Sequence, residues 1–133
     1  MEKLRMVKVT ENCPDITEAA KVVEIEDSVK SFDDEIDCHG YGGHDITSVP
    51  IGGINYAVIV DDAGVLKGRM VTILNQDRSR LLAGTALICK AVPPDLVSLS
   101  DEDVANIHRH IREMRKLSDR TICYVVECDN LEK

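Results

Sequence analysis

The sequence predicts an α+β fold, with a single mostly antiparallel sheet of about five strands and two helices packed on one face. Continuous apolar runs at residues 54 to 60 and 81 to 92 are typical of buried strands, and turn residues bound both. A third apolar pattern, which follows Ser100, has helical spacing instead. We therefore expect one domain over residues 1 to 133. In it, strands at 54 to 60 and 84 to 90 should lie side by side under a helix that begins at Asp101.

Two strands and a helix are expected in the N-terminal third. Residues 4 to 10 alternate between two faces, and residues 22 to 25 form a second apolar run. Ser28 is a suitable N-cap. It precedes apolar residues at helical spacing, namely Val29, Phe32 and Ile36. These residues predict a short helix with one buried side.

The middle of the chain is expected to be mainly strand. Residues 46 to 51 form a candidate strand interrupted by Pro50, and residues 65 to 74 form a shorter extended piece. A turn that contains Gly64 connects the strand at 54 to 60 to the extended piece at 65 to 74. We expect a positive φ at Gly64. The run at 81 to 92 ends at a Pro-Pro pair.

The C-terminal part predicts the longest helix and a last strand. Ser100 with Asp103 resembles a capping box. The inward stripe should consist of Val104, Ile107, Ile111 and Met114. The end of this helix and an extra strand should occupy residues 112 to 128. The strand, at residues 121 to 128, either completes this sheet or pairs with a second copy as a homodimer.

Charge and composition restrict the function. The 133 residues contain 24 acidic and 16 basic side chains, and residues 1 to 50 alone contain 12 acids and 5 bases. Such a surface repels phosphate backbones, so direct nucleic-acid binding is not expected. The sequence contains no signal-peptide pattern and no run long enough to span a membrane, which predicts a cytoplasmic protein. Its 5 cysteines are expected to be thiols, with Cys89 and Cys123 buried.

A polar cluster between two apolar segments is the candidate ligand-binding loop. Its residues are Asn75, Asp77, Arg78 and Arg80. Arginine and asparagine bind carboxylates, phosphates or backbone edges through paired hydrogen bonds. The alternative is that Asn75 and Asp77 cap their own turn and that the arginines balance the acidic N-terminal helix.

The helix after Ser28 is a candidate partner-binding surface because acids crowd its C-terminal end. These acids are Asp33, Asp34, Glu35 and Asp37. The helix dipole disfavours anions at that position. The carboxylates either have a partner or form a solvated acidic face.

Neither a catalytic site nor a cofactor is expected. No nucleophile is flanked by a known signature, and the two histidines of the C-terminal helix point to different sides. The weak metal-ligand candidates are Cys38, His39, His44 and Asp45. Zinc sites usually draw on two separated pairs of ligands, so we expect no metal and interpret this stretch as a polar loop.

Several short motifs resemble domain-of-unknown-function family 3846, whose members are small proteins of bacteriophages, plasmids and conjugative elements of bacteria. The resemblance covers residues 22 to 111. It is carried by Glu24 to Phe32, Asp62-Ala63-Gly64, Asn75 with Arg78, Ala83-Gly84-Thr85, and Leu99 to Asp103. The resemblance implies a mobile-element setting and a mixed fold, and it brings no established activity. Residues 115 to 133 extend past the family pattern, and His39 and His44 have no family role.

Together these patterns predict a non-enzymatic accessory protein of a mobile element or phage, which acts by binding an as yet unidentified protein. One alternative is a small-molecule or nucleotide-binding domain that uses the loop from Asn75 to Arg80. A second is an acidic mimic of DNA that inhibits nucleases, drawing on the acids between Glu24 and Asp45.

Overall fold

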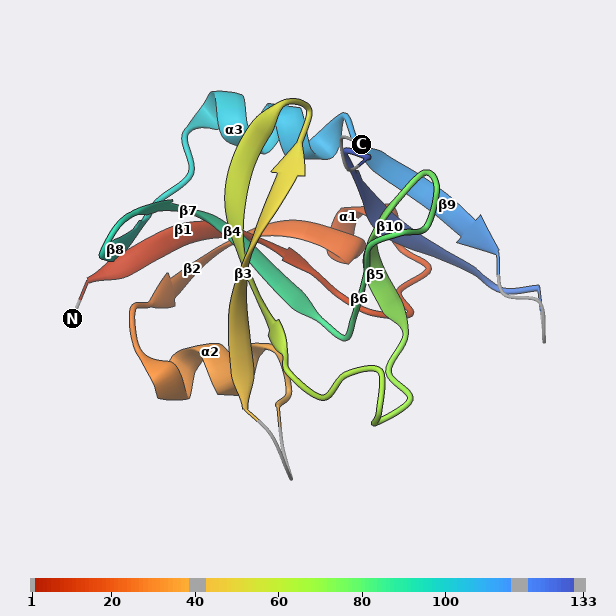
Figure 1. Ribbon diagram of the computed structural model, residues 1–133, viewed down its shortest axis with the longest axis horizontal. Helices are drawn as coiled ribbons and strands as arrows, with labels where there is room; N and C mark the ends of the chain where they lie inside the picture. Colours follow the sequence, from red (N-terminus) through yellow and green to blue (C-terminus); the bar gives the residue numbers. More distant parts are fainter. Residues whose placement is uncertain (1, 39–42, 116–119, 131–133) are drawn as a thin grey trace.

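The computed structural model describes residues 2–38, 43–115 and 120–130. The protein is α+β, as predicted, but its strands form two sheets instead of one (Figure 1). The strands of the larger sheet are β1 (Lys3–Val9), β2 (Ala20–Glu26), β3 (His44–Ile51), β4 (Ile54–Asp61), β7 (Ala86–Val92) and β8 (Asp95–Val97). The smaller sheet contains β5 (Val71–Asn75), β6 (Leu81–Ala83), β9 (Ile111–Arg115) and β10 (Ile122–Cys128). The helices within the described residues are α1 (Ile16–Ala19), α2 (Val29–Glu35) and α3 (Asp101–His108).

The larger sheet has the order β2-β1-β7-β4-β3, and β8 pairs with β7. All of its pairs are antiparallel. Val58 of β4 lies opposite Ile88 of β7. This register confirms that the apolar runs at 54 to 60 and 84 to 90 are neighbours.

The smaller sheet has the order β6-β5-β10-β9, and β5 and β10 are parallel. It arises because the apolar run at 81 to 92 is divided between the sheets. Gly84 has φ +101°, which lets the chain leave β6 and enter β7 in a new direction. The prediction of a single sheet of five strands is therefore wrong.

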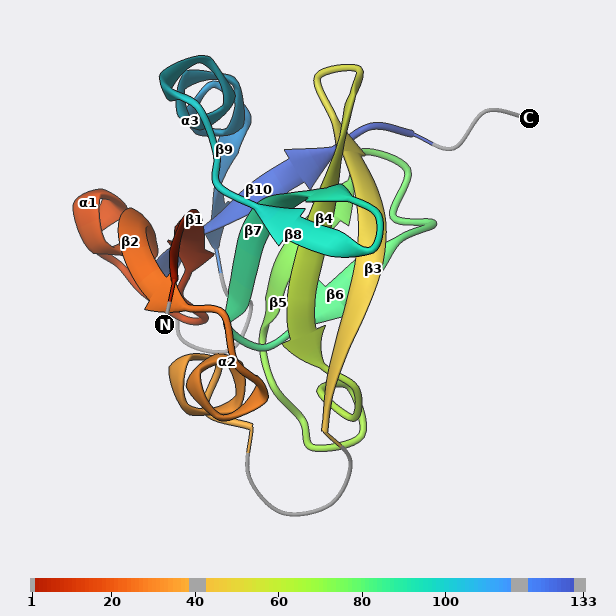
Figure 2. The same ribbon diagram turned by 90° about the vertical axis from the view of Figure 1, so that its left-hand side faces the viewer.

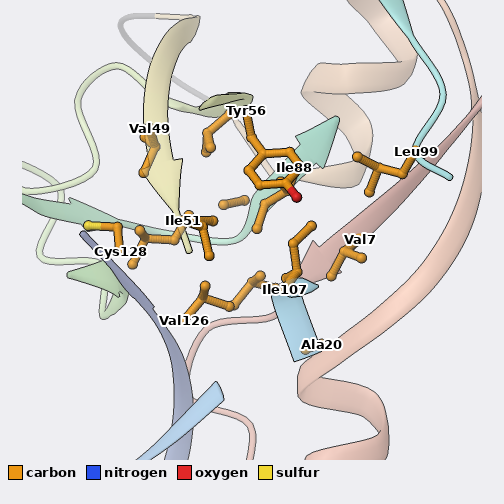
Figure 3. Packing of buried hydrophobic residues seen from close by; sticks show 14 of the residues in the cluster. Val7, Ala20, Val49, Ile51, Tyr56, Ile88, Leu99, Ile107, Val126 and Cys128 are labelled. Carbon is orange, nitrogen blue, oxygen red and sulfur yellow. The ribbon is translucent and has the colours of Figure 1, made fainter. Parts of the chain in front are cut away.

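The two faces of the larger sheet have different covers. Val58 and Ile88 belong to a buried cluster that includes Ile107 of α3 and Val126 of β10. Figure 3 shows Ile88, Ile107 and Val126 together. Alternate residues on the same strands belong to a second cluster with Phe32 of α2. The helices α2 and α3 thus lie on opposite faces, as Figure 2 shows, and the prediction that two helices share a face is wrong.

The C-terminal helix begins as predicted and ends early. Ser100 and Asp103 form the capping box, and Ile107 is fully buried. The helix stops at His108, and Ile111 and Met114 lie in β9 instead of continuing its stripe. Pairing with β10 explains the change, because residues 111 to 115 gain a full ladder of interstrand hydrogen bonds.

The last strand completes the smaller sheet of its own chain. It lies between β5, which pairs with residues 126 to 128, and β9, which pairs with residues 122 to 126. A homodimer through the C-terminal strand stays a prediction. Cys89 and Cys123 are buried, as predicted. In the described ranges, no helix is long and apolar enough to cross a membrane.

Candidate functional site

The loop from Asn75 to Arg80 is a turn built around one buried amide. Asn75 is fully buried at the end of β5. Its Nδ2 donates to Ser79 Oγ at 2.7 Å, and its Oδ1 accepts from the Arg80 backbone N–H at 2.9 Å. Both ends of the side chain are therefore used to close the turn.

Two more of the predicted ligand residues also hold the turn. Asp77 Oδ1 accepts from the Ser79 hydroxyl at 2.6 Å and from the Ser79 backbone N–H at 3.0 Å. These hydrogen bonds lower the pKa of Asp77. Arg80 Nη1 donates to the Ser48 carbonyl of β3 at 2.9 Å. The turn-capping interpretation is thus confirmed for Asn75 and Asp77, and Arg80 ties the turn to the larger sheet.

Arg78 is the one member of this group whose side chain points to solvent without a hydrogen-bond or ion-pair partner among the described residues. Its backbone is left-handed, with φ +58°. It lines a basin of about 310 Å³ together with Arg112 and Arg115 of β9. Sequence reasoning missed these two arginines because it assigned them to the end of a helix.

The acidic residues of α2 do not form one free surface. Asp33 Oδ1 lies 2.7 Å from His44 Nδ1, and Glu35 Oε2 accepts from Lys8 Nζ at 3.0 Å. Asp37 follows the helix with φ +55°, and its carbonyl accepts from an arginine. Asp34 is exposed. Two of these carboxylates are therefore engaged by side chains of β1 and β3, Lys8 and His44.

Of the weak metal candidates, His44 is engaged in other contacts, Cys38 is partly buried and Asp45 is exposed. His44 binds Asp33 and lies edge-on to the Phe32 ring, with centroids 5.9 Å apart. Burial and the nearby Asp61 raise the pKa of the half-buried Cys38 thiol. His39 lies outside the described residues, and within them no group of three His, Cys, Asp or Glu side chains is arranged to hold a metal ion.

A buried ionic network lies at the end of β4, and no sequence pattern indicated it. The carboxylate of Asp61 is fully buried, and Oδ2 accepts from Lys67 Nζ at 2.9 Å and from Arg69 Nη1 at 3.1 Å. Arg69 Nε also donates to Glu11 at 2.9 Å, and its Nη2 donates to the Ile36 carbonyl at 2.7 Å. One guanidinium thus ties the N-terminal loop, the end of α2 and the end of β4 together.

This network fixes the loop from Asp62 to Gly68. The Ala63 N–H donates to Asp61 Oδ1 at 2.9 Å, and the Lys67 N–H donates to the Ala63 carbonyl at 2.9 Å. The expectation of a positive φ at Gly64 is wrong, because the positive value lies at Gly68. Gly64 is needed for space instead, since a Cβ there would come within 2.2 Å of a backbone oxygen.

Two large aliphatic side chains project from this fixed loop. Val65 is 71% exposed and Leu66 is 81% exposed, the highest values among the large hydrophobic residues that the structure describes. Hydrogen-bonded turns hold the backbone of this loop. In one of them, the Gly68 N–H donates to the Val65 carbonyl at 3.0 Å. The loop is therefore an ordered apolar projection.

A second polar network surrounds Tyr56. Its residue types resemble those of a catalytic cluster, but its members bind one another. The buried Tyr56 hydroxyl donates to Asp103 Oδ1 at 3.2 Å and accepts from Asn106 Nδ2 at 2.9 Å. Lys90 Nζ lies 3.1 Å from the same Asp103 oxygen. Burial raises the pKa of Tyr56. Because these groups satisfy one another, the network joins α3 to β4 and β7.

The comparisons with known proteins identify no relative. No family model, curated protein or solved structure matches the chain significantly. The resemblance to family 3846 therefore stays a prediction.

Proposed function

We propose that the protein is a non-enzymatic accessory protein that acts by binding another protein, and that the loop from Asp62 to Gly68 makes the contact. The observation that carries this proposal is the exposure of Val65 and Leu66 on a loop anchored by buried Asp61. Scattered aliphatic residues are normal on protein surfaces. Two adjacent ones, projecting from a backbone held by an ionic network, suit an interface anchor.

The energetics favour this loop as an anchor. Complete burial of one such side chain contributes about 1.5 to 3 kcal/mol. Ordering a flexible loop at an interface opposes that gain, and a loop that is already fixed avoids most of this cost. The partner that fits is a protein with an apolar pocket for Val65 and Leu66. A neutral or basic rim suits the exposed Asp62 beside them and the net charge of −8.

The acidic helix α2 is a secondary contact surface. Asp33 and Glu35 have internal partners, which leaves Asp34 as the most accessible carboxylate of α2. The same pairing weakens the alternative of a DNA mimic, which needs a continuous row of unpaired carboxylates. The setting in a phage or mobile element belongs to this proposal and rests on the resemblance alone.

Site-specific crosslinking tests the proposal. A photoreactive residue at position 66 should give a discrete adduct with a protein of the bacterial host, which mass spectrometry identifies. Position 29 is the matched control, because Val29 is also an exposed valine, at 65%, but lies on α2. Crosslinking at position 29 should not give this adduct.

Affinity for the purified partner then measures the contribution of the anchor. Leu66→Ser should weaken binding by about 30-fold or more, the effect of losing an interface hot spot. Val29→Ser should leave the dissociation constant unchanged, and Asp34→Lys should change it only slightly. Equal affinities for the wild type and Leu66→Ser would exclude this loop as the contact.

A further inference from the structure

The strand β3 forms one end of the larger sheet, as Figure 2 shows. Its hairpin with β4 has a two-residue turn, closed by the pair Ile51 and Ile54. In such a hairpin the closing pair exchanges both hydrogen bonds, and so does every second pair after it. Pro50, which has no N–H, therefore directs its carbonyl away from β4, where it accepts from the Asp129 N–H at 2.8 Å. Every second residue before Pro50 faces outward in the same way.

The outward backbone groups of β3 are bonded only toward its C-terminal end. The Ser48 carbonyl accepts from Arg80 Nη1 at 2.9 Å. No hydrogen bond from the described residues reaches the Ser48 N–H, or the N–H and carbonyl groups of His44 and Ile46. The strand thus presents an open edge from His44 to Ser48.

This edge lacks the features that protect the other end strands. Edge strands avoid pairing with other chains when they are very short or carry charged side chains. The end strand β6 has only three residues, Leu81–Ala83. Charged residues mark the end strands β2 and β9, namely Lys21, Glu24, Glu26, Arg112, Glu113 and Arg115. From Ile46 to Ile51, β3 has no charged residue. It is therefore the end strand best suited to accept another strand.

A groove lies beside the open edge. Ser48 pairs in register with Ala57, which belongs to the cluster that packs against α2, so Ile46 and Ser48 lie on that face of the sheet. Together with Ala91 and Pro93 they line a groove of about 370 Å³. Ala57 is buried, whereas Ile46 is 46% exposed. In a strand added to this edge, the residue opposite Ile46 would place its side chain over the groove.

The charge of the edge indicates the kind of strand that fits. Asp45 is exposed and alternates with Ile46, so its carboxylate lies on the other face of the sheet. A cationic side chain opposite Asp45 would form a favourable cross-strand pair. A second copy of this chain is a poorer occupant, because two molecules with a net charge of −8 repel each other.

We propose that the open edge of β3 binds an extended segment of another protein as an additional antiparallel strand. In this segment, small aliphatic residues that face the groove alternate with Lys or Arg residues on the side of Asp45. Backbone hydrogen bonds supply the affinity, and the groove and the carboxylate supply the specificity. The antiparallel direction matches every pair of the larger sheet. The site is separate from the contact at Leu66, because it uses no residue of the loop from Asp62 to Gly68.

Fluorescence polarisation with the labelled peptide Thr-Val-Arg-Val-Arg-Val-Thr tests the proposal on the complete chain. Ile46→Pro should weaken binding about 10-fold or more, because it removes an outward donor and puts a ring in its place. The pairing with β4 should survive, as it does at Pro50. Glu24→Pro is the matched control and should leave the affinity unchanged. Glu24 is exposed on β2 and faces outward like Ala20, whose carbonyl lies 3.0 Å from His108 Nε2. Circular dichroism checks that both variants are folded.

Absence of binding to the wild type, or equal affinities of the wild type and a folded Ile46→Pro, would overturn the proposal. Modified peptides give a second test that leaves the protein unchanged. In an antiparallel addition, the valines direct their N–H groups to β3, and the arginines direct theirs away. N-methylation of the valines should therefore abolish binding, and N-methylation of the arginines should preserve it. Equal effects of the two modifications, or the reverse order, would contradict strand pairing.

The carboxylate has its own test. Asp45→Asn should weaken peptide binding about 3-fold, the effect of losing an exposed ion pair. Asp27→Asn, at an exposed carboxylate outside β3, is the control and should have no effect. An unchanged affinity of Asp45→Asn would reject the cationic half of the motif. Light scattering should show a monomer. A dimer that dissociates in Ile46→Pro would assign the edge to a second copy and overturn the proposal.

Discussion

Two turns of this protein do the same structural task with different chemistry. After β4, the turn is anchored by the buried carboxylate of Asp61, which needs Lys67 and Arg69 as counterions. After β5, the turn is anchored by the buried amide of Asn75, which is satisfied by Ser79 and the Arg80 backbone. A charged anchor recruits distant elements to neutralise it, whereas a neutral amide closes its turn with local groups alone.

The difference is reflected in what each turn exposes. In the first turn, the cations Lys67 and Arg69 pair with the buried Asp61. The side chains exposed to solvent there are aliphatic, namely Val65 and Leu66. The second turn needs no cation for its anchor and leaves Arg78 exposed. The two turns thus differ in what they present to solvent, aliphatic side chains in the first and a cation in the second.

Substitution of the charged anchor should have the largest effect. Asp61→Asn should lower the free energy of unfolding by about 3 kcal/mol or more, because Lys67 and Arg69 lose a buried counterion. Urea denaturation followed by circular dichroism measures the change. Asp62→Asn, at the adjacent exposed carboxylate, should change the value by less than about 0.5 kcal/mol. A similar effect of both substitutions would contradict the role of the network.

The same anchor should make stability depend on pH. Burial, the largest influence, raises the pKa of Asp61, but hydrogen bonds from Lys67, the Ala63 amide and Arg69 outweigh it and lower the pKa below 3.8. A lowered folded-state pKa means that the stabilisation is present above the unfolded-state value, about 3.9, and is lost as the pH falls through the folded value. The difference in stability between wild type and Asp61→Asn should therefore shrink below about pH 4.

The neutral anchor should contribute less, and without this pH dependence. Asn75→Ala should cost about 1 to 3 kcal/mol, since the Arg80 N–H and the Ser79 hydroxyl lose their partner. Denaturation at pH 7 and at pH 4 should give the same loss. The neighbouring exposed Gln76, changed to Ala, is the control and should leave the stability unchanged. A larger loss for Asn75→Ala than for Asp61→Asn would reverse the comparison.

The smallest change in stability is expected at the exposed arginine of the second turn. Arg78→Gly should change the free energy of unfolding by less than about 1 kcal/mol, in the favourable direction if any, because glycine adopts a positive φ without strain. Urea denaturation measures the change. A loss of stability comparable to that of Asn75→Ala would make Arg78 part of the anchor.

The sequence predicted the elements that have strong local signals. The β4 and β7 runs, the Ser100 capping box and the burial of Ile107 all follow from patterns within a few residues. The end of α3 could not be predicted, because Ile111 and Met114 fit a helical stripe and no Gly or Pro marks the boundary. Pairing with β10, a tertiary interaction, decided the outcome there.

The site was predictable only in part for a similar reason. Turn chemistry explains Asn75 and Asp77, whose partners are two to five residues away. The grouping of Arg78 with Arg112 depends on a parallel pair of strands whose partners lie about fifty residues apart. No spacing in the sequence indicates that these two strands are paired. None indicates the ionic network around Asp61 either.

The burial of Cys89 provides a built-in reporter. It lies in β7, between β1 and β4, and burial raises the pKa of its thiol to about 12. The Cys89 side chain packs in the cluster that contains Phe32 of α2, so a thiolate-selective reagent in neutral buffer can reach this sulfur only when that cluster opens. Its alkylation rate, measured by peptide mapping, thus reports how often this face of the larger sheet is uncovered.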